Sequence, residues 1–197
     1  MNSLLSNIFL LPMGIGSSIL LGLSAYKDNN FSLLTDNKSY NKPISALLLL
    51  SFTYFVTDFL FMIIKYKPRH KIFFIHHALG ILTIPMIYFN NYHLVKYVLA
   101  YLTFELTTPL LNISIANRQN NIIGHYRKIT DSIFLITYTL VRIIFGSYLM
   151  YKTVPITYEM KYPYKCLMFS PIAIQALNYW WYYKILSVVF KRKQIKA

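Results

Sequence analysis

Six long apolar stretches constrain this chain more than any other feature of its sequence. A helix that crosses the hydrocarbon core of a bilayer needs about 20 mostly apolar residues. Strands are disfavoured, because the apolar runs are too long and show no period of two. The sequence therefore predicts an all-α, polytopic membrane protein, a bundle of about six transmembrane helices. The expected helices lie at about residues 4–26, 43–64, 72–89, 94–115, 130–151 and 166–189.

The composition agrees with a lipid environment. Hydrophobic residues make up 56% of the 197 residues and charged residues only 13%, whereas a soluble domain has about 25% charged residues. The net charge of +14 would suit a nucleic-acid partner. However, the chain has no recognisable nucleic-acid-binding motif, so we expect none. The single cysteine, Cys166, excludes an intrachain disulfide and a thiolate zinc site.

The chain divides into three parts by composition. We expect an N-terminal transmembrane helix and loop at 1–39, a five-helix domain at 40–190 and a basic cytosolic tail at 191–197. The first apolar stretch also suits a cleaved signal peptide, but Met1–Leu10 lacks the lysine or arginine that such a peptide carries. Lysine and arginine are more frequent in the tail and in the loops around 65–71 and 118–128 than in the other loops. This distribution predicts that both termini are cytosolic. Nothing in the sequence predicts an oligomeric state.

Polar side chains recur inside the apolar stretches at helical spacing. A charged side chain at membrane depth is costly, so it usually faces the bundle interior and a partner. We therefore expect a polar-lined central cavity, although packing between helices uses the same residue types. Glu105 and Arg142, both near mid-depth, are expected to lie within reach of each other or of a shared partner. The inward-facing set is Asp58, His76, His77, Tyr101, Glu105, Thr108, Asn112, Asp131, Tyr138, Arg142, Gln175, Asn178 and Tyr182.

The adjacent histidines His76 and His77 suggest chemistry inside the membrane. Consecutive helical side chains diverge by about 100°, whereas metal-binding pairs prefer positions i and i+4. We therefore predict no metal and no resident cofactor. One imidazole is expected to face the cavity as a base or nucleophile, and the other to pack against a helix or a carboxylate. Asp58 or Glu105 is expected to orient the active ring.

Four segments, in this order, resemble the TLC (TRAM–Lag–CLN homology) domain family. They are "DFLFMIIKYKPRHKIFFIHH" (Asp58–His77), "FELTTPLLN" (Phe104–Asn112), "VRI" (Val141–Ile143) and "NYWW" (Asn178–Trp181). The resemblance covers about residues 40–190. It is closest to the small TLC-domain-containing transmembrane proteins and more distant to the ceramide synthases.

The resemblance implies helices around a central cavity that accepts a fatty acyl chain. In ceramide synthases a histidine takes part in acyl transfer from acyl-CoA to a sphingoid base. His76 and His77 match that histidine pair, while Glu105 and Thr108 fall where the motif has two aspartates. This departure argues against ceramide synthesis itself. The resemblance therefore implies a protein of the endoplasmic reticulum that acts in lipid homeostasis, with a membrane lipid or acyl chain as its partner and acyl-CoA as a candidate substrate.

Two sets of site residues follow from these arguments, together with three functional alternatives. The candidate catalytic residues are His76, His77, Glu105 and Asp58, and the candidate cavity residues are Tyr101, Thr108, Asn112, Arg142 and Asn178. Acyl transfer is one alternative, and non-catalytic lipid sensing, lipid carriage or escort of membrane cargo is the second. The third is a small transporter that uses Asp58, Glu105 and His77 as a relay. It is disfavoured because the sequence shows no inverted repeat.

Overall fold

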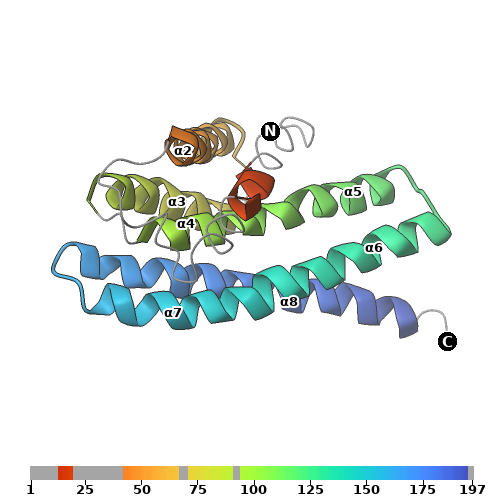
Figure 1. Cartoon of the computed structure of the whole chain (residues 1–197). Helices are drawn as coiled ribbons and strands as arrows, with labels where there is room; N and C mark the ends of the chain where they lie inside the picture. The colour runs from red at the N-terminus through yellow and green to blue at the C-terminus, as the bar shows by residue number, and fades with distance from the viewer. Residues whose placement is uncertain (1–12, 20–41, 67–70, 91–93, 195–197) are drawn as a thin grey trace. The chain divides into compact units, whose positions relative to one another are not determined.

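The computed structural model describes residues 13–19, 42–66, 71–90 and 94–194 (Figure 1). These residues are helical apart from short turns, and none of them forms a strand. The predicted all-α fold is therefore confirmed. The chain forms two compact units, Met1–Pro109 and Leu110–Ala197, and each unit has its own internal packing.

The first unit is built around two neighbouring helices, α2 (Lys42–Ile64) and α3 (Lys71–Asn90). They pack along each other, and α3 also contacts α4 (Val95–Leu102). Residues 13–19 form a short helix that lies against this group. A Cβ atom added to its Gly14 would lie 2.8 Å from the Leu106 side chain, so the two segments are in close contact. The rest of the predicted 4–26 helix lies outside the described residues.

The fourth apolar stretch forms one helical segment with a tightened turn inside it. The segment runs from α4 through the 3-10 turn η4 (Thr103–Leu106) into α5 (Thr107–Gln119). The turn comes shortly before Pro109, which has no backbone N–H to donate to the Glu105 carbonyl group. In the same segment, the hydroxyl groups of Thr103 and Thr107 donate to the backbone carbonyls of Ala100 and Phe104. The tightened turn carries Glu105, which is 6% exposed.

The second unit contains a long helical rod and the last helix. The rod runs from α6 (His125–Tyr138) through the π-helix η5 (Thr139–Phe145) into α7 (Gly146–Tyr158). A short 3-10 turn, η6 (Tyr164–Met168), leads into α8 (Phe169–Gln194). Helix α8 returns along the rod and packs against both α7 and η5, as the blue and cyan helices of Figure 1 show.

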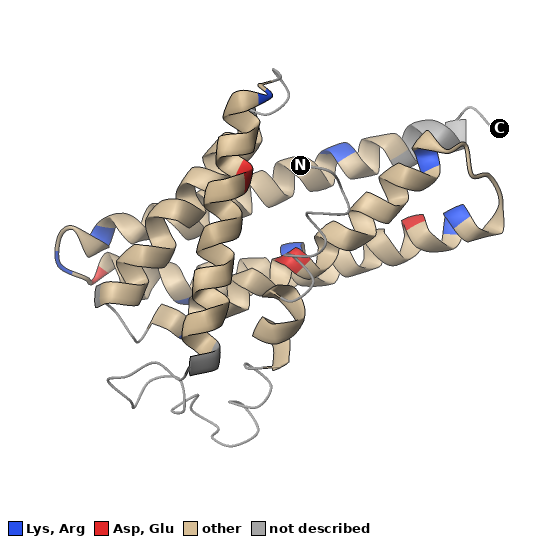
Figure 2. Cartoon of the chain, turned by 90° about the horizontal axis from the view of Figure 1, so that it is seen from above, with Lys and Arg blue, Asp and Glu red and all other residues tan. Residues whose placement is uncertain are grey.

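Four helices of the described part are long and apolar enough to cross a membrane. They are Ile44–Ile64, Ile72–Phe89, Val95–Gln119 and His125–Tyr158, and they overlap the second to fifth predicted stretches. Figure 2 shows charged residues separated by long uncharged runs of helix. The protein is therefore a multi-pass integral membrane protein. Helix α8 has 26 residues and is about 39 Å long, but it is less apolar, and the total number of crossings stays a prediction.

Many large apolar side chains lie exposed on the outer faces of these helices. A soluble monomer rarely leaves contiguous apolar patches of this kind uncovered. The lipid bilayer covers them here, while polar side chains are buried between helices. Buried polar residues include Ser51, His77, Glu105, Thr107, Ser114, Asn117, Arg142, Gln175 and Asn178.

Candidate functional site

The two adjacent histidines of α3 take different partners. His77 is 4% exposed, and its Nε2 atom lies 3.0 Å from Oδ2 of Asp58 on α2. Its Nδ1 atom lies 2.9 Å from the carbonyl oxygen of Phe73, one turn earlier. Nε2 makes no hydrogen bond to the described residues, so its contact with Asp58 is electrostatic. The ring is thus held on one edge by the backbone and faces a carboxylate on the other.

His76 faces the second carboxylate. Its Nε2 atom lies 3.8 Å from Oε1 of Glu105, and its side chain is 15% exposed. This distance is an ion-pair contact and is too long for a hydrogen bond. The hydroxyl group of Thr108 donates to the other carboxylate oxygen, Oε2, at 3.1 Å. Thr108 therefore holds Glu105 so that one oxygen remains directed at His76.

Phe55 packs against both histidines. Its ring centroid lies 5.7 Å from that of His76 and 5.4 Å from that of His77, in edge-on contacts. Gly80 makes this position possible, because a Cβ atom there would lie only 2.9 Å from the Phe55 ring. The sequence analysis missed Phe55. Gly80, one turn after the histidines, was the available signal of a close approach to α3, because small residues let membrane helices pack closely.

The first unit therefore brings all four candidate catalytic residues into two histidine–carboxylate pairs. Asp58 pairs with His77 across α2 and α3, and Glu105 pairs with His76 across α3 and η4. Among the described residues, no three histidine, cysteine, aspartate or glutamate side chains converge as metal ligands would. The arrangement suits proton transfer, in which a carboxylate orients an imidazole.

The candidate cavity residues are divided between the two units. Thr108 belongs to the Glu105 pair, and Tyr101 of α4 is half-buried, with its ring centroid 5.4 Å from that of Phe104. Asn112 is half-buried on α5 in the second unit. Arg142 and Asn178 are also in the second unit, where they contact each other. The predicted coupling of Glu105 to Arg142 stays a prediction.

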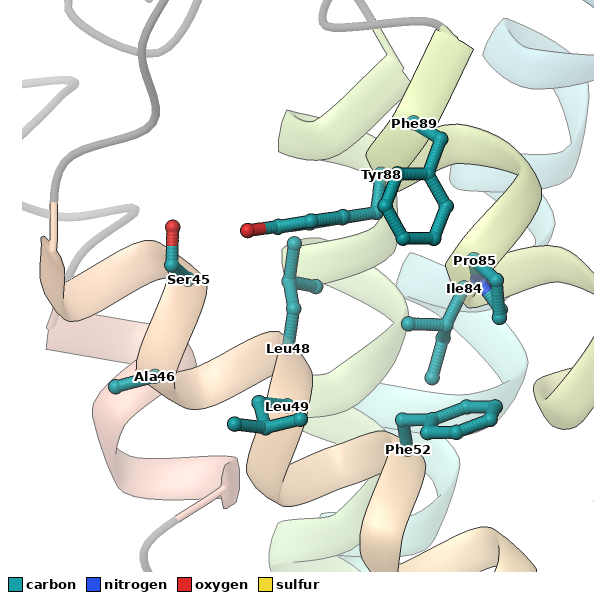
Figure 3. Close-up of a pocket in the computed structure, with 9 residues that line it drawn as sticks. All are labelled: Ser45, Ala46, Leu48, Leu49, Phe52, Ile84, Pro85, Tyr88 and Phe89. Carbon is teal, nitrogen blue, oxygen red and sulfur yellow. The ribbon is translucent and has the colours of Figure 1, made fainter.

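A groove lies between the first half of α2 and the second half of α3. It has a volume of about 350 Å³ and is apolar except for two hydroxyl groups. In Figure 3, Phe52 of α2 lies below Ile84 and Pro85 of α3, and Leu48 of α2 points toward Tyr88. None of the predicted cavity residues lines this groove. Its full lining is Ser45, Ala46, Leu48, Leu49, Phe52, Ile84, Pro85, Tyr88 and Phe89.

A second polar cluster surrounds Arg142, which is 6% exposed. Its Nη1 atom donates to the side-chain oxygen of Asn178 at 3.3 Å, and its guanidinium group lies 5.5 Å from the centre of the Tyr138 ring. The Tyr138 hydroxyl group donates to the backbone carbonyl of Asn178 at 3.2 Å. Tyr138 and Arg142, both named in the inward-facing set, therefore contact each other and share Asn178 as a partner.

The π-helix η5 carries Arg142, whose backbone carbonyl accepts a hydrogen bond from α8. Inside a membrane, backbone groups freed by irregular turns need new partners. The side chain of Gln175 donates to the Arg142 carbonyl at 3.1 Å, and the Ser147 hydroxyl group donates to the Ile143 carbonyl. π-Helical turns are frequent at functional sites. Apolar periodicity did not reveal η5, because one widened turn hardly changes the pattern.

Asp131 belongs to a third polar cluster, at the junction of α5 and α6. It accepts a hydrogen bond from the Ser114 hydroxyl group, and Nη2 of Arg118 lies 3.4 Å from its Oδ2 atom. Nε of Arg127 is 3.9 Å from the same oxygen. Asp131 was named in the inward-facing set, and these contacts join it to the end of α5.

The family model of the TLC domain matches residues 1–187. A TLC domain-containing protein of Acanthamoeba polyphaga mimivirus is 40% identical over 187 residues, which cover 93% of this chain and 92% of the viral protein. An uncharacterised TLC domain-containing protein of Schizosaccharomyces pombe is 26% identical over 184 residues. That match covers 90% of this chain and 60% of the yeast protein.

Proposed function

Because this chain belongs to the TLC domain family, we propose that it acts on membrane lipids through its histidine pair and contributes to lipid homeostasis. The supporting observation is the pair of histidine–carboxylate contacts inside the membrane-spanning helices of the first unit. Ionisable residues at membrane depth are costly and usually serve a function. We place the protein in the endoplasmic reticulum, with both termini in the cytosol.

His76 is the proposed reacting residue. It is more exposed than His77, and Glu105 is held opposite its Nε2 atom by Thr108. A carboxylate that orients an imidazole is the arrangement used for general-base catalysis, and such contacts are often long before substrate binds. His77 is the proposed positioning residue, because the Phe73 carbonyl and Asp58 face its two nitrogens.

The proposed reaction is acyl transfer from a fatty acyl thioester to the amine of a lipid. The replacement of two motif aspartates by Glu105 and Thr108 argues against ceramide as the native product, so a long-chain base serves here as a test acceptor of the same chemical class. The amine nitrogen attacks the thioester carbonyl, so a C–N bond forms and the C–S bond breaks. His76 accepts the proton that the amine loses and returns it to the leaving thiolate. The products are an amide and a free thiol, and acyl-CoA serves as the thioester substrate.

Lipid carriage or sensing without catalysis is the second candidate function. The α2–α3 groove supports it, since the groove is large enough for part of an acyl chain and no acidic or basic residue lines it. In this case the histidine pairs stabilise the helices around a bound lipid. The two functions differ in whether a covalent product forms.

Purified protein in nanodiscs, supplied with fatty acyl-CoA and a long-chain base, tests the proposal. Acyl transfer predicts an amide product and free thiol, with at least a hundredfold loss of rate in His76→Gln. His125→Gln removes an exposed imidazole elsewhere and serves as the matched control. Mass spectrometry of lipid that co-purifies with the protein tests the second function. If no amide product forms and no acyl lipid is retained, both candidate functions are contradicted.

A further inference from the structure

The hairpin formed by the end of α5 and the start of α6 lies at one surface of the membrane. Two consecutive candidate spans, Val95–Gln119 and His125–Tyr158, end and begin there. The residues between them, 120–124, are all exposed. The hairpin therefore connects two crossings at the level of the lipid headgroups.

An exposed stripe along the α6–η5–α7 rod gives the depth of the hairpin. Its members recur every three or four residues, as one face of a helix requires. Tyrosine occupies both ends, and tyrosine is enriched where the membrane meets water. The distance from Tyr126 to Tyr148, the first of the two tyrosines at the other end, is about 33 Å along the helix, close to the hydrocarbon thickness of about 30 Å. The stripe is Tyr126, Ile129, Ile133, Ile136, Leu140, Ile144, Tyr148 and Tyr151.

Positive charge gathers at the Tyr126 end of this stripe. Arg127 and Lys128 follow Tyr126 directly, and Arg118 lies across from them at the end of α5. Asp131 is the one acidic residue between Glu105 and Glu159 in the sequence, and it is shared by both arginines. The cluster therefore keeps a net positive charge at headgroup depth.

Two further features point to a ligand at this surface. The Arg118 side chain is 36% exposed, so its guanidinium group is within reach of an acceptor such as a phosphate oxygen. Ile123, at the tip of the hairpin, is 85% exposed next to Gly124, whose φ angle is 108°. An apolar tip beside basic residues is typical of segments that rest in an anionic lipid surface.

We propose that the α5–α6 hairpin binds anionic phospholipid headgroups. Arg118, Arg127 and Lys128 bind the phosphate groups, and Ile123 inserts among the upper acyl segments. Charge complementarity favours an anionic headgroup at this surface, because a zwitterionic headgroup supplies no net charge to balance the basic cluster. The hairpin binding surface lies within the second unit and is separate from the histidine pairs.

Lipid retention by the full chain tests this assignment. The protein is reconstituted in vesicles of phosphatidylcholine and phosphatidylserine and extracted gently, and retained lipids are counted by native mass spectrometry. We expect phosphatidylserine to be enriched over its share in the vesicles. R127Q/K128Q should lower this enrichment about fivefold for each charge removed. K152Q/K161Q removes two exposed lysines elsewhere in the second unit and should leave the enrichment unchanged.

Two more variants separate headgroup binding from a folding defect. Arg127 contacts Asp131, so Lys128→Gln alone is tested beside the double variant, with thermal melting in detergent measured for each. We expect wild-type melting and a fivefold loss of enrichment for Lys128→Gln. Ile123→Ser should lower total lipid retention. The proposal would be overturned if K152Q/K161Q lost phosphatidylserine enrichment to the same extent, or if the wild type showed no phosphatidylserine enrichment.

Discussion

At the scale of single residues, the histidine pair shows how neighbouring side chains acquire different environments. Divergence by about 100° on a helix predicted that His76 and His77 would be unequal, and their partners are indeed different carboxylates. The sequence did not show which partner each would take. That choice depends on the register of α2 against α3, where Gly80 lets Phe55 approach both rings.

Gly80→Ala should disturb this arrangement. Its new Cβ atom would lie 2.9 Å from the ring of Phe55, which is buried and rigid. Overpacking of this kind costs about 1–3 kcal/mol, so we expect a lower melting temperature in detergent. Phe55→Leu in the Gly80→Ala background should recover part of the loss. Gly16→Ala, whose Cβ atom would meet the flexible Leu47 side chain at 3.3 Å, is the milder control. Wild-type melting of Gly80→Ala would contradict the close packing.

At the scale of secondary structure, the apolar pattern predicted helices well and irregular turns poorly. The second and third stretches match α2 and α3 to within one residue at each end. The 3-10 turn in the fourth stretch lies shortly before Pro109, a residue type that interrupts helices. The π-helix gave no comparable signal. The groove was also missed, because its shape depends on how side chains of α2 and α3 pack, which no single helix encodes.

Gln175→Leu tests the hydrogen bond that completes the π-helix. The change keeps a similar volume but removes the donor to the Arg142 carbonyl and to the Ser147 hydroxyl group. A buried group left without its partner costs about 1–3 kcal/mol. Denaturant unfolding in detergent micelles should show this loss. Gln119→Leu at the exposed end of α5 should change stability by less than about 0.5 kcal/mol. If the two variants unfold alike, the Gln175 contact does not stabilise the rod.

At the scale of the whole molecule, this chain is a multi-pass membrane protein with two histidine–carboxylate pairs in its first unit. The low charge of the sequence predicted the membrane environment, because few charged residues remain to cover a water-facing surface. The orientation in the membrane stays a prediction. It depends on lysine and arginine in loops, whose effect is exerted during insertion and leaves no trace in helix packing.

Glycosylation mapping tests the orientation. Acceptor sites placed in the 27–42 loop should be modified in the lumen of the endoplasmic reticulum, and acceptors in the 65–71 loop should not. The reason is the larger number of basic residues in the second loop and in the tail. The reverse pattern would invert the topology, and modification of both loops would contradict a crossing between them.

The lipid profile of cells that express the protein tests the central claim most directly. Wild-type protein, His76→Gln, His77→Gln and the His125→Gln control are expressed at matched levels, and membrane lipids are quantified by mass spectrometry. We predict that wild type and His125→Gln change the profile alike. His76→Gln should abolish the change while melting like the wild type, and His77→Gln should mainly lower the melting temperature. If His76→Gln and His77→Gln both change the lipid profile as the wild type does and both melt like the wild type, the assignment of the site is contradicted.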